Sequence, residues 1–384
     1  MYTDKLFSAI SILLLALTTT TLNVEAQLPG KWPPVDTPPP PVASWTALVD
    51  QTKLAKAPIR PPGTPCAPVD TFCVWSCTTC TRPESDFTNC PNKGDWALTY
   101  DDGPTTNTLK VLDALNTRGL KATFFAIGSR VIENPQILKQ IVDNGHQVGV
   151  HTWSHTPLTS QTTEEIIAEV KWTETAIKQA VGLTPKWFRP PQGDFDDRVR
   201  GILTQLGYKS AIWNHDTFDW ESNSDPTYDL SWIPGNFSIW VQNTTAPTGF
   251  ASLEHDAFNK SSSMTPVAMD IVLKAKFHPE SVSVCTGDKQ PYVENVQLPK
   301  SNIQGDTTTP TTGGAGAGAG AGAGKGATTG AGAGAGAGTG TTTTSGLPPV
   351  LSKSGTASIE KNVLLSIVCG LIMMIFGFAG TVYI

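Results

Sequence analysis

The stretch Thr99-Tyr100-Asp101-Asp102-Gly103-Pro104 places two adjacent carboxylates directly after an alternating apolar run at residues 96–100. Alternation with a period of two predicts a β-strand, and Gly103-Pro104 predicts the turn that ends it. Both acids should therefore lie at the carboxyl-terminal tip of a strand, where α/β folds place their chemistry. Because neighbouring strand residues point to opposite faces, one carboxylate could hold a metal while the other acts as a base. An ordinary turn formed by Asp and Gly is the alternative interpretation.

Strands and helices alternate after this stretch. The further predicted strands are residues 121–128, 147–150, 186–189, 210–214 and 250–254. One helix is predicted to end at Gly145, and another begins at the capping box Thr162-x-x-Glu165. Repeated units of this kind favour an α/β fold with a parallel sheet, either open or closed as a barrel.

Four more polar clusters follow predicted strands, so parallel strands would bring all five clusters to one mouth. The four are His151-Thr-Trp-Ser-His155, Arg189-Pro-Pro-Gln192-Gly, Asp216-Thr-Phe-Asp219-Trp220 and Leu253-Glu-His255-Asp256. Two imidazoles four residues apart would meet on one face of a helical turn. With a carboxylate they form a site suited to catalytic zinc. A fixed Arg can orient a carboxylate, and a His paired with a carboxylate is a candidate general acid.

These five motifs, in this order, resemble those of the NodB-like polysaccharide deacetylases, carbohydrate esterase family four, and among them the fungal chitin deacetylases. The resemblance covers about residues 93–285 and implies a distorted (β/α) barrel. It further implies that Asp101 is the general base. The implied ligands of a divalent metal, usually Zn²⁺ with Co²⁺ possible, are Asp102, His151 and His155.

The resemblance also implies roles for the remaining motif residues. Arg189 would orient Asp101, and the backbone N–H of Gln192 would help to form the oxyanion hole. Many family members have Tyr at the position of Gln192, a change that a backbone donor tolerates. His255 would be the general acid, tuned by an Asp of the fourth motif, for which Asp219 is preferred and Asp216 is the alternative. The residues expected to line the sugar pocket are Tyr100, Trp220 and Leu253.

The implied activity is removal of N-acetyl groups from cell-wall chitin, which gives chitosan and acetate. Two alternatives stay open at this point. The same chemistry could act on another acetylated wall polysaccharide such as xylan, or the chain could be a wall-anchored binding protein without catalysis. The net charge of −6 argues against a nucleic-acid partner, which needs a basic footprint.

The ends of the chain predict an extracellular, anchored protein. Residues 1–26 have the basic start, short apolar run and small cleavage residues of a signal peptide. Residues 354–384 fit a GPI signal that is removed on attachment of the lipid, with Ser354 as the attachment site. An ordinary single-pass anchor is the alternative. The mature protein would then lie at the outer face of the plasma membrane and in the cell wall.

Composition divides the rest of the chain. The predicted segments are a Pro-rich linker at 27–65, a Cys-rich lead-in segment at 66–92, the catalytic domain at 93–285 and a Thr/Gly/Ala-rich stalk at 286–353. Six of the seven cysteines lie outside the tail, and in a secreted chain they predict disulfides whose pairing stays open. Cys77-Thr-Thr-Cys80 alternatively resembles half of a zinc knuckle or a redox motif. The predicted glycosylation sites are Asn236, Asn243 and Asn259.

Overall fold

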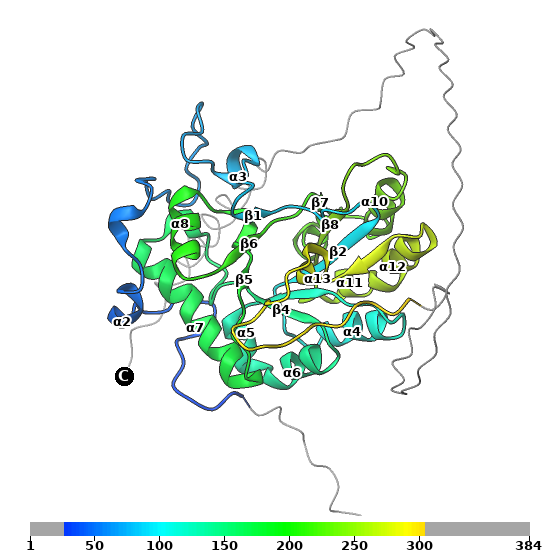
Figure 1. Ribbon diagram of the computed structural model, residues 1–384, viewed down its shortest axis with the longest axis horizontal. Helices are drawn as coiled ribbons and strands as arrows, with labels where there is room; N and C mark the ends of the chain where they lie inside the picture. The colour runs from blue at the N-terminus through cyan, green and yellow to red at the C-terminus, as the bar shows by residue number, and fades with distance from the viewer. Residues whose placement is uncertain (1–26, 304–384) are drawn as a thin grey trace, which may run out of the picture. The chain divides into compact units, whose positions relative to one another are not determined.

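The structure is a computed structural model that describes residues 27–303 (Figure 1). The predicted signal peptide, the Gly/Ala-rich part of the stalk and the GPI signal with Ser354 lie outside the described residues. No helix within residues 27–303 combines the length and apolar character needed to cross a bilayer.

A single parallel sheet organises the described residues. Its strands are β1 (Asp86–Phe87), β2 (Asp95–Asp101), β3 (Thr123–Ala126), β4 (Gln147–Val150), β5 (Trp187–Phe188), β6 (Lys209–Ala211), β7 (His215–Asp216), β8 (Phe250–His255) and β9 (His278–Glu280). They lie in the order β1-β6-β5-β4-β3-β2-β8-β7, and β9 also pairs with β2. Every pairing is parallel. Within the described part of the chain β1 and β7 do not pair with each other, so the sheet is a curled, incomplete barrel.

Helices cover the outside of this sheet (Figure 1). They are α2 (Ala43–Thr46), α3 (Trp75–Thr78), α4 (Thr108–Asn116), α5 (Gly128–Glu133), α6 (Pro135–Asp143), α7 (Thr163–Val181), α8 (Asp197–Gln205), α9 (Glu221–Ser224), α10 (Trp232–Trp240), α11 (Asn259–Ser262), α12 (Thr265–Lys274) and α13 (Val282–Thr286), with 3-10 turns η1 (Gln51–Lys53), η2 (Leu158–Ser160) and η3 (Pro191–Gly193). The longer helices contact one another in the succession α10, α12, α4, α6, α7, α8. Helix α7 begins at Thr163, and its N-cap Thr162 forms the predicted capping box with Glu165.

The central strand β2 separates two apolar regions, because its side chains alternate between its faces. Trp96, Leu98 and Tyr100 belong to the main core under the helices. Ala97 belongs to a smaller cluster on the other face, and Asp101 shares that face by register. The alternation that predicts this strand therefore also decides which side chains face the inside of the half-barrel.

Residues 27–65 differ from the predicted linker, because they pack against the domain. Leu28, Val49 and Leu54 are buried in the main core. The ring of Trp32 stacks on Trp153 at 6.1 Å between ring centroids. The Pro34 carbonyl accepts a hydrogen bond from Trp153 Nε1 at 2.9 Å. The proline content makes this segment extended, but apolar residues spaced along it bury enough surface to fix it.

The end of the domain also differs from the prediction, because residues 286–303 are packed rather than part of a stalk. Tyr292 is 1% exposed, and its hydroxyl accepts a hydrogen bond from the Val148 N–H at 2.8 Å. Glu294 accepts the Thr184 N–H at 2.7 Å. The Ser301 hydroxyl accepts the Lys121 N–H at 2.8 Å. The composition change to Thr, Gly and Ala marks the boundary better than the last cysteine does.

The predicted disulfides are present. Three bonds join Cys66 to Cys77, Cys73 to Cys80 and Cys90 to Cys285. Because Cys77 and Cys80 are each bonded to other partners, the zinc-knuckle and redox-motif interpretations of Cys77-Thr-Thr-Cys80 are wrong.

Candidate active site

The carboxyl ends of neighbouring strands bring the five polar clusters together, as the sequence predicts. Asp101 is the last residue of β2, and His255 is its register partner at the end of β8. His151 directly follows β4, and Arg189 directly follows β5. The parallel sheet therefore places side chains separated by up to about 150 residues of sequence at one edge.

Asp102, His151 and His155 form a cluster with the donor set of a metal site. Their ligand atoms all lie within 4.8 Å of one another, and within residues 27–303 no other group of three such side chains meets this condition. Asp102 Oδ1 lies 3.4 Å from His151 Nε2 and 3.2 Å from His155 Nε2. The same oxygen is buried without a hydrogen-bond partner. One orphaned carboxylate oxygen facing two imidazole nitrogens fits a divalent cation such as zinc.

The protonation of the cluster suits metal binding. His151 Nδ1 lies 2.9 Å from the Arg189 carbonyl, so this nitrogen donates a proton and leaves Nε2 as the free electron pair. Burial lowers the pKa of His155, which favours the neutral ring that a metal needs. Burial alone would raise the pKa of Asp102, but the facing imidazoles of His155 and His151 outweigh it and hold this pKa well below its usual range.

The backbone of this cluster has neither the helical turn predicted for residues 151–155 nor the strand alternation predicted for Asp101 and Asp102. Residues 151–155 form a loop rather than a helical turn, and Thr152 and His155 have φ of 63° and 61°. Asp102 has φ of 78°, so it lies past the strand and strand alternation does not place it. Both carboxylates consequently face His151, whose Nε2 is 3.7 Å from Asp101 Oδ2. Left-handed backbone of this kind in non-glycine residues clusters at functional sites.

Asp101 is held by a buried arginine. Arg189 Nη1 lies 2.9 Å from Asp101 Oδ1 and also donates to Thr99 Oγ1 at 2.7 Å. Arg189 is 0% exposed, its Nε donates to the Ala211 carbonyl, and its guanidinium lies 4.3 Å from the centre of the Phe125 ring. Burial lowers the pKa of Arg189 against the opposing effect of Asp101. One oxygen of Asp101 is thus fixed by Arg189, while the other faces the Asp102–His151–His155 cluster.

Asp219 rather than Asp216 contacts His255. Its Oδ1 lies 2.7 Å from His255 Nδ1, and its Oδ2 accepts the His255 backbone N–H at 2.8 Å. Asp216 instead accepts hydrogen bonds from Trp213 Nε1 and the Phe218 N–H. Burial acts to lower the pKa of His255, but its pairing with Asp219 outweighs burial and raises this pKa to about 10. The His255 ring is therefore protonated at neutral pH.

Gln192 lies in the η3 turn that follows Arg189. Its φ is 57°, and the next residue, Gly193, has φ of 64°. The hydrogen bonds of the turn are donated by the N–H groups of Gly193, Asp194 and Phe195 rather than by that of Gln192. The Gln192 side chain is exposed. The position of Gln192 is thus compatible with a role of its backbone N–H.

Comparison with known proteins places this geometry in a family. Residues 88–211 match the polysaccharide deacetylase family. The chain carries a polysaccharide deacetylase domain. It is 35% identical over 314 residues to chitin deacetylase 1 of Cryptococcus neoformans var. grubii, an alignment that covers 76% of this chain and 66% of that protein. It is 36% identical over 252 residues to a chitin deacetylase of Amylomyces rouxii, covering 63% of this chain and 59% of that protein. The chain therefore spans less than two thirds of the length of these relatives.

The fold comparison agrees with the predicted (β/α) barrel of the deacetylase domain. The structure of the chitin deacetylase from the fungal pathogen Colletotrichum lindemuthianum superposes with a TM-score of 0.51 at 29% identity. The superposition covers 55% of this chain and 96% of that chain. The predicted fold class is confirmed, with the parallel sheet open rather than closed.

The three residues predicted to line the sugar pocket of the deacetylase domain have different environments. The prediction for Tyr100 is wrong. Its side chain is 0% exposed and stacks on Phe124 in the core, because Tyr100 and Asp101 are strand neighbours and face opposite sides. Trp220 is half-buried at the start of α9. Leu253 is 4% exposed on β8, where it pairs with Thr99 on the face that carries Asp101.

Two acidic residues that support the site of the deacetylase domain escaped the sequence argument. Glu169 of α7 accepts hydrogen bonds from the N–H groups of Trp153 and Ser154 at 2.7 and 2.9 Å, so it holds the loop of the metal cluster. Asp256 accepts the Gly103 N–H at 2.9 Å. Asp256 lies within a recognised motif and could have been found there. Nothing in the helix pattern singles out Glu169.

The three sequons lie on the surface around α10 and α11. Asn243 and Asn259 are exposed. Asn236 is half-buried within α10, and its Nδ2 donates to the Thr217 carbonyl at 3.5 Å. The exposed side chains of Asn243 and Asn259 leave room for a glycan. All three glycosylation sites stay predictions.

Proposed function

We propose that the protein is a metal-dependent chitin deacetylase, which hydrolyses the N-acetyl groups of N-acetylglucosamine residues to give chitosan and acetate. The observation that carries this proposal is the arrangement of the Asp102–His151–His155 cluster beside the Arg189–Asp101 pair. The two fungal relatives named chitin deacetylase support chitin as the substrate.

The chain's residues divide the reaction among themselves. A divalent metal, zinc by its donor set with cobalt as the alternative, would polarise the amide carbonyl and acidify a water. Asp101 takes the proton of the attacking water, and Arg189 holds Asp101 in the orientation that this needs. The backbone N–H of Gln192 donates to the oxyanion that develops on the carbonyl oxygen.

The acid step falls to His255. The amine that leaves must gain a proton, and His255 carries one at neutral pH because its pKa is about 10. Asp219 fixes Nδ1 of the ring, so Nε2 is the nitrogen that donates. Trp220 and Leu253 contact the sugar. The half-buried indole of Trp220 supplies an apolar face, and Leu253 forms part of the floor.

The test is release of acetate by the full-length protein from chitin oligomers and from acetylated xylan. We expect release from the chitin oligomers that a chelator abolishes and added zinc restores. Release from xylan alone would replace the substrate and keep the mechanism. No release from either polymer by metal-loaded protein would contradict the proposed deacetylase activity and favour a wall-anchored binding protein.

We also propose that the protein is attached to the outer face of the plasma membrane and the cell wall by a GPI lipid at Ser354. The small residues around Ser354, the polar spacer and the terminal apolar segment support this proposal. Phosphatidylinositol-specific phospholipase C should release the protein from intact cells. Retention after this treatment, with release by detergent, would favour a single-pass anchor instead.

A further inference from the structure

A short segment stapled by two disulfides lies next to the turn that carries Gln192. We call residues 66–80, which include α3, the stapled segment. It contains the bonds Cys66–Cys77 and Cys73–Cys80. The residues of this segment lie outside the sequence that matches the deacetylase family, which begins at residue 88. Two disulfides over so few residues restrict the conformations of this segment, and they fix the side chains that it presents to the domain.

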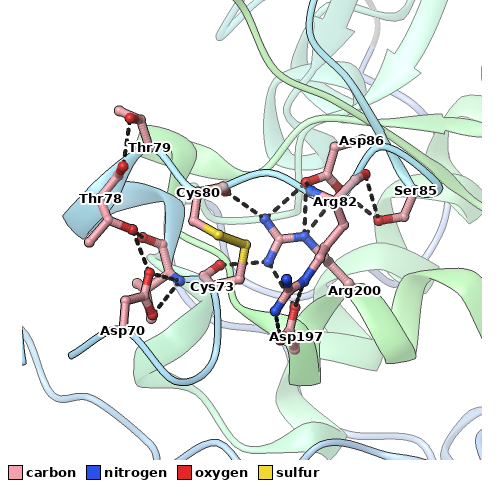
Figure 2. Close-up of a disulfide and its surroundings, with 11 residues drawn as sticks. Asp70, Cys73, Thr78, Thr79, Cys80, Arg82, Ser85, Asp86, Asp197 and Arg200 are labelled. Carbon is pink, nitrogen blue, oxygen red and sulfur yellow. Dashed lines mark hydrogen bonds and ion pairs between the residues drawn. A yellow bond between two sulfur atoms is a disulfide. The ribbon is translucent and has the colours of Figure 1, made fainter.

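Arg200 fixes the stapled segment to the domain (Figure 2). Its guanidinium donates to the Cys73 carbonyl at 2.6 Å and to the Cys80 carbonyl at 3.1 Å, so it binds both ends of one disulfide. Arg200 is 4% exposed and forms an ion pair with the buried Asp86 at 2.9 Å. A buried, fully paired arginine of this kind holds its partners firmly, because breaking the ion pair would leave an uncompensated buried charge.

The other side of the stapled segment contacts the η3 turn directly. The Trp75 N–H donates to the Phe195 carbonyl at 3.1 Å. The Ser76 hydroxyl donates to Asp194 Oδ1 at 2.7 Å. The indole of Trp75 covers Gly193 so closely that a Cβ at that glycine would lie 2.1 Å from the ring. Two side chains and one backbone group of α3 thus hold the residues on the C-terminal side of Gln192.

The η3 turn needs such support. Gln192 and Gly193 both have left-handed backbone, with φ of 57° and 64°. For a residue with a side chain this conformation costs about 1–2 kcal/mol, and it persists where the surroundings over-determine it. Trp75 also packs edge-on against Trp213 at 4.7 Å, and the Arg189 guanidinium lies 5.4 Å from the Trp213 ring. Trp75 therefore touches both the Gln192 turn and the aromatic ring beside Arg189.

We propose that the stapled segment is a working part of the active site, in which Trp75 is a positioning residue that holds the η3 turn so that the Gln192 N–H faces the reacting carbonyl. This inference rests on the proposed function of Gln192. The segment lies outside the family match but would affect catalysis. The Cys73–Cys80 bond and Arg200 keep Trp75 in place.

The test compares Trp75→Ala and Trp75→Phe in the full-length protein, with Val69→Ala as a control at a 75% exposed position of the same segment. We expect Trp75→Ala to lower kcat for chitin oligomers about 10-fold or more while KM stays within about twofold, because a displaced donor weakens the transition state and not substrate binding. Trp75→Phe keeps a ring over Gly193 and should recover most of kcat. Val69→Ala should behave as the wild type.

A second readout does not depend on turnover. Amide hydrogen exchange of peptides from residues 190–195 should be faster in Trp75→Ala than in the wild type and near normal in Trp75→Phe, while peptides from residues 147–155 are unchanged. If the wild type releases no acetate, the proposed function fails and this exchange pattern still decides whether Trp75 holds the turn.

Three outcomes would overturn the inference. They are unchanged kcat and exchange in Trp75→Ala, a rise in KM alone, which would make Trp75 a substrate contact, and loss of metal together with kcat, which would indicate a general structural defect. If Trp75→Ala fails to fold, Ser76→Ala replaces it. This variant removes only the hydrogen bond to Asp194, and we expect about a twofold to fivefold loss of kcat with unchanged KM.

Discussion

At the scale of the residue, Asp219 decides the proton affinity of His255. Replacing Asp219 by Asn removes the charge that outweighs burial, so the pKa of His255 should fall from about 10 toward or below neutrality. We expect the alkaline limb of the kcat profile to move to lower pH in Asp219→Asn. The exposed Asp229→Asn serves as the control, and a limb that does not move would contradict the role of His255 as the acid.

The same pairing links His255 to stability. Its folded-state pKa lies above the ordinary value of 6.5, so the folded protein holds this proton more tightly than the unfolded chain does. The stabilisation is therefore complete below about pH 6.5 and is lost as pH rises through about 10. Asp219→Asn should make the unfolding midpoint less dependent on pH across this interval.

Asp101 separates catalysis from metal binding. Asp101→Asn removes the proposed base but keeps the shape of the side chain beside Arg189. We expect acetate release to fall by about 10²- to 10⁴-fold, with zinc content near that of the wild type. Asp113→Asn, at an exposed position of α4, is the matched control. Near-normal turnover in Asp101→Asn would assign the base to another group.

At the scale of the element, α7 supports the metal cluster from behind. Glu169 is 0% exposed, and burial raises its pKa against the three hydrogen bonds that it accepts from Trp153 and Ser154. Glu169→Ala should free the loop that carries His151 and His155. We expect zinc affinity to fall about 10- to 100-fold, as for other residues that orient metal ligands.

Competition with a chelator of known affinity measures this change. Glu169→Gln, which retains one acceptor oxygen, should fall between the wild type and Glu169→Ala. Glu164→Ala, in the first turn of the same helix, is the control, because its side chain accepts a hydrogen bond from Gln51 and does not contact the loop of residues 151–155 in any hydrogen bond or ion pair within residues 27–303. Equal zinc affinity in all four proteins would show that the loop holds its shape without α7.

The elements with a strong local pattern are the ones that the sequence predicts. Alternation finds β2, and a capping box finds the start of α7. The two-residue strands β1 and β7 are too short to carry a period, and their pairing partners alone define them. In the site, residue type and order along the chain predict the cluster, whereas the left-handed backbone at Asp102 and His155 comes from tertiary contacts that no local pattern shows.

At the scale of the whole molecule, the N-terminal residues complete the core. The ring of Trp32 lies 6.1 Å from both Trp153 and Trp172, and its Nε1 donates to the Leu28 carbonyl at 3.1 Å. We expect Trp32→Ala to lower the free energy of unfolding by about 2 kcal/mol, less than for a fully buried Trp because this ring is half-buried. Urea denaturation measures the change, and Val35→Ala at a 40% exposed position is the control.

The position of β2 within the sheet governs how the domain can form during synthesis. Residues 95–101 leave the ribosome early, but two of their three partners, β8 and β9, lie some 150–180 residues later in the chain. The edge of β2 that pairs with β8 and β9 therefore stays unpaired until nearly the whole domain has been synthesised. Such high contact order slows folding and exposes an aggregation-prone edge. Chains that end before residue 280 should need chaperones in the secretory pathway and be degraded there.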